Sequence, residues 1–138
     1  MVLNMKVTFD TETIKTISLF QQLTGCHVVD TAEDEGEKYF VVGEGEYGLA
    51  VGKEGSKVKN AEKVFKKPIK VFEYSQDLER FVKNLIPEAQ QISIKDKSIR
   101  VKIKPQDRAK VIGKGGSKVK TIGNFLKRLF DVEDFKVV

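Results

Sequence analysis

The most constraining feature of the chain is a loop sequence that occurs twice. Residues 52–59 read GKEGSKVK and residues 113–120 read GKGGSKVK, so seven of eight positions are identical at a constant offset of 61 residues. Each copy follows an aliphatic residue, Val51 or Ile112, and precedes apolar residues at helical spacing. This repeat, in a chain of 138 residues, predicts two small units of similar structure.

Around the first loop, sequence patterns predict the order helix, strand, strand, helix, helix, strand. Apolar residues recur every three positions in the first helix, Asp10 or Thr11 is a suitable cap, and Gly25 is suited to end it. Pro68 stops the third helix before the last strand. The predicted elements are a helix over 11–23, strands over 27–31 and 38–42, a helical turn over 47–51, a helix over 58–65 and a strand over 69–74.

The second unit repeats this order. Ser75 or Asp77 is a suitable cap for its first helix, and Pro105 opens the short helix before the loop. The predicted elements are a helix over 78–86, strands over 92–94 and 99–103, a short helix over 105–112, a helix over 119–129 and a strand over 132–138. At the start of the chain, Val7 and Phe9 alternate with polar residues, which fits a brief edge strand or a segment that merely packs.

Composition narrows the partners and the compartment. The 25 Lys and Arg residues outnumber the 20 Asp and Glu residues, which gives a net charge of +5 and favours an anionic partner. Cys26 is the only cysteine, so an internal disulfide and a thiolate zinc site are both excluded. The chain has no run of 18 apolar residues and no signal-peptide pattern. We therefore expect a cytoplasmic protein with no membrane partner.

The order of elements and the place of the loop resemble those of the type II KH domain. The resemblance rests on VGKEGSKV at 51–58, on IKVFEYS at 69–75 leading directly into a helix, and on IGKGG at 112–116, and it covers nearly the whole chain from about Lys6. Among KH proteins, the sequence most closely resembles the archaeal NusA-like transcription termination and antitermination factors. The resemblance implies an α+β fold of two tandem type II KH domains, residues 1–75 and 76–138. Each would be an αββααβ unit with helices packed on one face of a three-stranded sheet.

This resemblance implies a protein that binds single-stranded RNA and acts in transcription elongation or termination. It implies a monomer without cofactor or metal, which is not an enzyme, with the RNA polymerase elongation complex as a further partner. Two alternatives remain open: a KH-type ribosome-associated or RNA-processing factor, and a protein-interaction adaptor for RNA polymerase. An enzyme is the weakest alternative, because the sequence offers no paired carboxylates, metal cluster or activated nucleophile.

The residue types in the loops suit a sugar-phosphate backbone. Glycines let the backbone approach, the helix after each loop presents unpaired N–H groups, and lysines add positive charge. The candidate RNA-binding residues are Gly52, Lys53, Glu54, Gly55 and Lys57 in the first unit, and Gly113, Lys114, Gly115, Gly116 and Lys118 in the second. By resemblance, an apolar groove beside each loop holds the bases. Its walls would include Val51, Val58 and Val71 in the first unit, and Ile112, Val119 and either Phe135 or Val137 in the second.

The two loops are not equivalent. Glu54 places a negative charge in the first loop where the second has Gly115, so we expect the second unit to bind phosphate more strongly.

Residues 43–48 match the G-x-G-x-x-G pattern of dinucleotide-binding folds, but two glutamates there would repel a pyrophosphate, and we interpret the segment as a turn. Cys26 and His27 are adjacent, which favours structural roles over nucleophilic catalysis because neighbours on a strand point to opposite faces.

Overall fold

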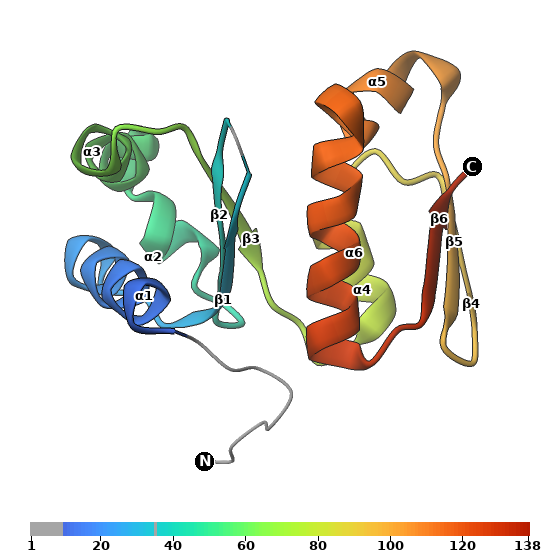
Figure 1. Cartoon of the computed structure of the whole chain (residues 1–138), viewed down its shortest axis with the longest axis horizontal. Coiled ribbons are helices and arrows are strands. Elements are labelled where there is room, and N and C mark those ends of the chain that lie inside the picture. The colour runs from blue at the N-terminus through green and yellow to red at the C-terminus, as the bar shows by residue number, and fades with distance from the viewer. Residues whose placement is uncertain (1–9, 35) are drawn as a thin grey trace. The chain divides into compact units, whose positions relative to one another are not determined.

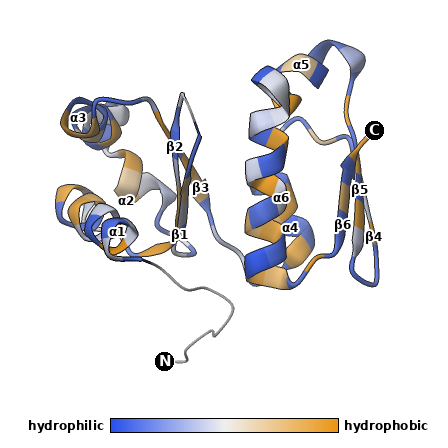
Figure 2. Cartoon of the chain, in the orientation of Figure 1, coloured by the Kyte–Doolittle hydropathy of each residue, from blue (hydrophilic) through white to orange (hydrophobic). Residues whose placement is uncertain are grey.

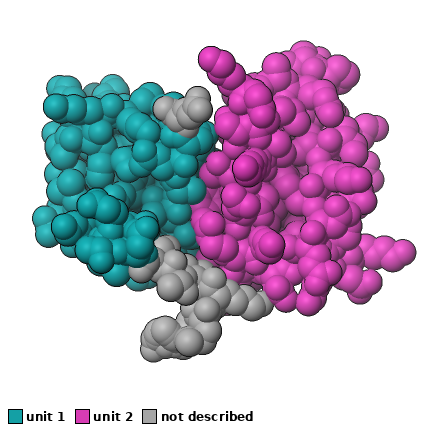
Figure 3. All heavy atoms as spheres, viewed as in Figure 1, with its two compact units in different colours: residues 1–75 teal, residues 76–138 magenta. Residues whose placement is uncertain are grey.

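The computed structural model describes residues 10–34 and 36–138, which form two compact units (Figures 1 and 3). The first unit ends at Ser75 and the second begins at Gln76. The brief segment predicted around Val7 and Phe9 lies outside the described residues. Within the described ranges, none of the helices combines the length and the hydrophobicity needed to cross a membrane.

Unit 1 is a three-stranded sheet with its helices on one face (Figure 1). The strand order is β1-β2-β3, with β2 antiparallel to β1 and parallel to β3. A short 3-10 turn, Lys53–Gly55, separates the second and third helices. The elements are α1 (Thr11–Thr24), β1 (Val28–Glu33), β2 (Lys38–Val42), α2 (Tyr47–Val51), α3 (Ser56–Phe65) and β3 (Ile69–Glu73).

Unit 2 has the same order of elements and the same strand pairing. Its sheet runs β4-β5-β6, with β5 antiparallel to β4 and parallel to β6. The elements are α4 (Leu78–Leu85), β4 (Gln91–Lys95), β5 (Ser98–Lys102), α5 (Arg108–Ile112), α6 (Ser117–Phe130) and β6 (Asp134–Val137). The predicted α+β class and the order αββααβ are therefore confirmed.

The helix ends follow local side-chain chemistry. The Asp10 carboxylate accepts a hydrogen bond from the Thr13 backbone N–H at 2.8 Å, and Asp77 caps α4 in the same way through the N–H of Glu79. Such caps each stabilise a helix by about 1 kcal/mol. Gly25 ends α1 with φ of 80°, a left-handed conformation that glycine adopts at little cost. These features confirm the predicted start and end of α1 and the start of α4.

Some element ends, or their causes, differ from the sequence-based predictions. Helix α3 ends at Phe65, the predicted residue, but the cause is the left-handed conformation of Lys66, with φ of 60°, before the chain reaches Pro68. Asp131 ends α6 in the same way, so β6 begins later than the predicted strand over 132–138. Strand β1 begins at Val28 and its pairing with β2 shifts register between Val28 and Asp30. Hydrophobic periodicity does not predict left-handed residues at helix ends or a shift in strand register.

The core of each unit lies between the sheet and its helices. In unit 1 the rings of Phe20 from α1 and Phe40 from β2 are stacked, with centroids 3.8 Å apart and planes within 5°. Both side chains are fully buried. In unit 2, α6 alternates hydrophobic and hydrophilic residues (Figure 2). The largest fully buried side chains of unit 2 are Phe81, Leu85, Ile86, Ile99, Ile122, Phe125 and Leu126.

We expect Phe20→Ala to lower the free energy of unfolding by about 3–5 kcal/mol, because it removes the stacked ring and leaves a cavity. The matched control is Ile14→Ala on the same helix, where the side chain is 54% exposed and the change should stay within about 0.5 kcal/mol. Urea denaturation followed by circular dichroism measures both. Equal effects of the two substitutions would contradict the assignment of Phe20 to the core.

Candidate nucleic-acid interface

The two glycine loops have nearly identical backbone conformations. Gly52 has φ of 79° and ψ of 173°, and Gly113 has φ of 79° and ψ of 172°. The glycine that precedes the long helix also matches, with φ of 74° at Gly55 and 80° at Gly116. A repeated sequence therefore produces a repeated local structure, and each copy leads into the helix that follows.

The first glycine of each loop is required by packing inside the loop. A Cβ atom at Gly52 would lie 2.9 Å from the backbone nitrogen of Lys57, and one at Gly113 would lie 2.9 Å from that of Lys118. Real Cβ atoms essentially never come so close to another heavy atom. The absence of a side chain lets the loop fold back onto the first turn of the helix.

The outer part of the second loop faces open space. A Cβ atom added at Gly115 or Gly116 would meet no heavy atom within 4 Å. Both residues have positive φ, and so does Glu54, which adopts φ of 53° at the position that corresponds to Gly115. The loop therefore leaves room for a ligand at its tip, and a residue other than glycine fits the middle position.

The long helix after each loop begins without a side-chain cap. The N-cap residues of α3 and α6 are Gly55 and Gly116, which have no side chain to accept hydrogen bonds from the first N–H groups. These N–H groups and the positive end of the helix dipole favour anions. Together with the open loop tip, this arrangement suits a phosphate group.

The candidate lysines have different environments. Lys53 and Lys114, at the loop tips, are exposed. Lys57 is half-buried, and its ammonium group donates a hydrogen bond to the backbone carbonyl of Thr24 at 2.9 Å. Lys57 thus ties the first loop to the end of α1, a role that sequence reasoning missed because the two residues lie 33 positions apart.

Lys118 lies in a different electrostatic setting, beside Glu88. Burial raises the pKa of the Glu88 carboxyl, but a backbone hydrogen bond and the charges of Lys110 and Lys118 together lower it below its usual value. Lys110 contacts the Glu88 carboxylate at 3.1 Å. The basic groups near the second loop are therefore partly balanced by one carboxylate.

The predicted groove residues divide between core and groove. Val58 and Val71 pack against the buried cluster of unit 1 that contains Phe20 and Phe40, and Val51 is half-buried. In unit 2, Ile112 is half-buried beside the loop. Val119 and Phe135 line a groove between α6 and β6, whereas Val137 is buried. Of the two alternatives for β6, Phe135 is the residue that lines the groove.

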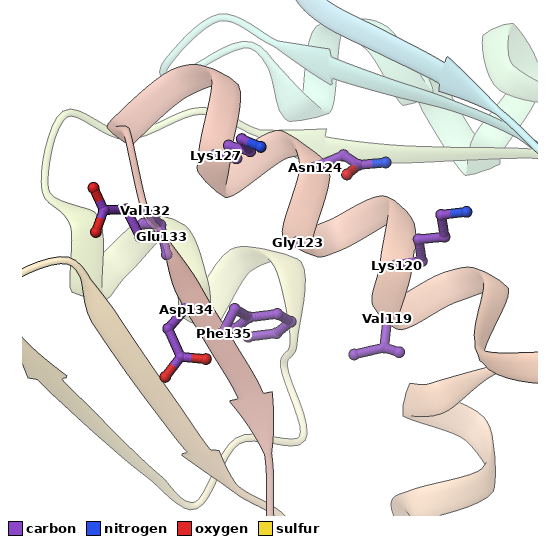
Figure 4. Close-up of a pocket in the computed structure, with 9 residues that line it drawn as sticks. All are labelled: Val119, Lys120, Gly123, Asn124, Lys127, Val132, Glu133, Asp134 and Phe135. Carbon is purple, nitrogen blue, oxygen red and sulfur yellow. The ribbon is translucent and has the colours of Figure 1, made fainter.

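The groove of unit 2 lies along the seam between α6 and β6, and its volume is about 290 Å³ (Figure 4). The Phe135 ring lies between the strand and the helix. Sequence reasoning did not identify Gly123, Asn124 and Lys127, which also line this groove. The only sequence feature that pointed to them was a glycine inside a predicted helix, which often has a packing or functional reason. The lining residues are Val119, Lys120, Gly123, Asn124, Lys127, Val132, Glu133, Asp134 and Phe135.

The carboxylate of Asp134 at the groove is neutralised by a neighbour. Arg100 donates a hydrogen bond to it at 2.7 Å, and the Ser98 hydroxyl lies 3.1 Å from the same oxygen. The Arg100 hydrogen bond holds the pKa of the Asp134 carboxyl below its usual value. Arg100 therefore balances a negative charge beside the groove.

Charge differs strongly between the units. The first 75 residues contain 10 lysines and 12 acidic residues, whereas the remaining 63 contain 15 Lys or Arg residues and 8 acidic ones. The net charges are therefore −2 and +7. This asymmetry adds to the effect of Glu54 and makes unit 2 the more attractive one for a polyanion.

Residues 43–46 of the segment 43–48 form a turn, as expected, and Tyr47 and Gly48 begin α2. The Gly43 carbonyl accepts a hydrogen bond from the N–H of Glu46 at 3.0 Å, and the Glu46 carboxylate accepts one from the backbone N–H of His27 at 2.6 Å. The neighbouring Cys26 is buried, with its thiol 3.0 Å from the Thr24 hydroxyl. These residues stabilise the approach to α2.

Comparisons with known proteins agree with this architecture. Residues 77–138 match the family described as KH domain. A protein of Methanococcus vannielii named "Probable transcription termination protein NusA" is 38% identical to the chain, over 97% of the chain and 81% of that protein. The chain belongs to the archaeal NusA family. A relative of the same name from Methanocaldococcus jannaschii is 32% identical, over 96% of the chain and 76% of its own length.

A solved structure supports the fold over nearly the whole chain. The structure titled "Crystal structure of APE1850" superposes with a TM-score of 0.73 and 34% sequence identity. The match covers 94% of this chain and all of the other. Unit 2 is thus a KH domain by sequence, and the family relationship extends through unit 1.

We expect Gly113→Ala to destabilise the protein more than Gly116→Ala. Gly116 is in the left-handed helical region, where a side chain costs about 1–2 kcal/mol. Gly113, with φ of 79° and ψ of 172°, is in a region that essentially only glycine adopts, and a Cβ atom there would also be forced against the Lys118 backbone. Thermal unfolding of the two variants measures the difference. Gly116→Ala serves as the matched control, and equal melting temperatures would contradict the packing role of Gly113.

Proposed function

We propose that this chain is a single-stranded RNA-binding protein of transcription elongation or termination, built from two tandem type II KH domains at residues 1–75 and 76–138. The names of its relatives and the KH domain match at 77–138 support the proposal. For unit 1, the support is the repeated order of elements, the repeated strand pairing and the repeated loop. The proposed further partner is the RNA polymerase elongation complex.

The observation that carries the proposal is the conformation of the duplicated loop. In each copy, the loop packs closely against the first turn of the following helix because its first glycine has no side chain. The N-terminus of that helix has no side-chain cap. In the second loop the tip is open and carries an exposed lysine. Phosphate oxygens of a single strand can accept hydrogen bonds from such N–H groups while the bases lie in the adjoining groove. In this proposal the protein acts as a cytoplasmic monomer and catalyses no reaction.

The second loop is the stronger phosphate site in this proposal. Its unit carries a net charge of +7, its middle residue is the neutral Gly115, and its helix leads along an open groove. In the first loop, Glu54 adds a negative charge and Lys57 is engaged with the Thr24 carbonyl. RNA held mainly by unit 2 would bind with an affinity that falls as the salt concentration rises.

We expect the double substitution Lys114→Asp and Gly115→Asp to weaken binding of single-stranded RNA at least about tenfold, because it places two negative charges at the loop tip. Glu54 holds the corresponding backbone conformation in unit 1, so the fold should tolerate a side chain at residue 115. Fluorescence anisotropy with labelled RNA, compared with single-stranded DNA and duplex RNA, measures the affinity.

The matched control changes net charge equally at another edge of unit 2. Lys95→Glu with Gln91→Glu alters two exposed residues of β4 by the same total charge. This control should bind RNA with nearly the affinity of the unmodified protein. If both double variants lose affinity equally, binding depends on overall charge and the loop is not the site. If the unmodified protein binds no RNA, the proposed function is wrong.

The asymmetry of the loops gives a second expectation. Lys114→Asp should reduce RNA affinity more than Lys53→Asp, because the two changes remove the same charge at corresponding loop positions of unequal units. Titrating both single variants of the full chain at one fixed salt concentration measures the difference. A larger loss from Lys53→Asp would overturn the assignment of unit 2 as the stronger site.

A further inference from the structure

The same helix position carries opposite residue types in the two units. Glu62 in α3 and Gly123 in α6 each lie seven residues after the glycine that caps the helix, and they are separated by the same 61 residues as the two loops. Each position faces the seam between the long helix and the last strand. The two residues affect that seam in different ways.

In unit 1 the side chain of Glu62 spans the seam. Its carboxylate accepts a hydrogen bond from the backbone N–H of Ile69 at 2.9 Å, at the start of β3. Strand β3 is at the edge of its sheet, and an edge strand has outward-facing N–H and C=O groups without a strand partner. The Glu62 carboxylate therefore accepts a hydrogen bond from one of these outward-facing N–H groups, and it places a negative charge at the seam.

In unit 2 the corresponding helix position has no side chain. A Cβ atom at Gly123 would lie 3.4 Å from Cδ2 of Phe135, so the ring packs directly against the helix at this point. The groove between α6 and β6 includes both residues (Figure 4). Glycine inside a helix costs about 0.5–1 kcal/mol relative to alanine, so its place at the seam calls for a packing or functional reason.

We propose that Gly123 keeps the groove of unit 2 open for a nucleobase of single-stranded RNA, and that Glu62 closes the corresponding seam of unit 1. This inference rests on the proposed RNA-binding function. The half-buried Phe135 ring supplies an aromatic surface for a base, and base–aromatic contacts are tolerant of sequence. Asn124, on the same seam, has an amide group that can both donate to and accept from the edge of a base.

The electrostatics of the two seams favour the same division. At the groove of unit 2, Lys120 and Lys127 are lining residues, and Arg100 balances the Asp134 carboxylate. The carboxylate of Glu133, which also lines the groove, lies 3.7 Å from the Lys97 ammonium group. The seam of unit 1 instead carries the Glu62 carboxylate, which would repel the phosphate attached to an incoming base. The residue at this helix position thus determines which unit can accept a base.

The test compares two probes on the full chain. One probe is a labelled eight-nucleotide RNA pool randomised at every position, and the other is an abasic strand of the same length. The abasic strand reports only contacts to the sugar-phosphate backbone. We expect Gly123→Glu to weaken binding of the RNA pool about tenfold. Binding of the abasic strand should change much less, because the loop is unaltered.

Two further variants separate the effects of bulk, charge and folding. Gly123→Gln fills the seam without a charge and should also reduce binding of the RNA pool. Gln91→Glu adds one negative charge on the exposed face of β4 and should leave both probes unaffected. Helix α6 keeps its ordinary backbone at residue 123, so both side chains are compatible with the helix, and circular dichroism checks that it is retained.

The outcomes distinguish this inference from the proposed function. Selective loss of the RNA pool in both Gly123 variants would support it. Unchanged affinity for the RNA pool in Gly123→Gln would overturn it, because filling the seam would then be harmless. Equal losses for the pool and the abasic strand would also overturn it and leave the loop as the whole site. Binding of neither probe by the unmodified protein would overturn the proposed function and this inference together.

Discussion

The closest backbone approach in each loop is the constraint on which the site depends. Because Gly52 and Gly113 have no Cβ atom, the chain can turn back until the loop lies against the backbone of Lys57 or Lys118. That contact sets where the long helix begins and where its first N–H groups point. The sheet packs against that helix, and the seam lies between the helix and the last strand of the sheet. A larger residue at either glycine would alter the direction of the helix and the shape of everything beside it.

Identical loop geometry coexists with different surroundings in the two units. The conformations of the two loops agree closely, yet the charge around them does not. In unit 1 a loop lysine is engaged with the Thr24 carbonyl and a helix carboxylate is engaged with Ile69. Both groups are thus used to hold unit 1 together. In unit 2 the corresponding seam has a glycine and a groove, so the same helix position is occupied by a hydrogen-bonded carboxylate in one unit and lines a groove in the other.

Sequence patterns predicted the elements well because most of their signals are local. The caps Asp10 and Asp77, the glycine that ends α1 and the helical periodicity all act within a few residues of their effect. The contact of Lys57 with Thr24 was not predictable, since it depends on how two distant helices pack. In the sequence, Gly123 was notable only as a poor helix former. Its contact with Phe135 could not be predicted, because it depends on β6 packing beside α6. Hydrophobic periodicity therefore predicted the helices and strands, whereas these contacts depend on tertiary packing.

The residue at the helix–strand seam also bears on how a duplicated chain can diverge. Residue 62 is glutamate and residue 123 is glycine. Some glutamate and glycine codons differ by one base, so one nucleotide change can convert one residue type into the other. The two units keep the same order of elements and strands although they differ at this position. Under the roles proposed for Glu62 and Gly123, each copy of such a repeat can gain or lose an accessible seam through one substitution.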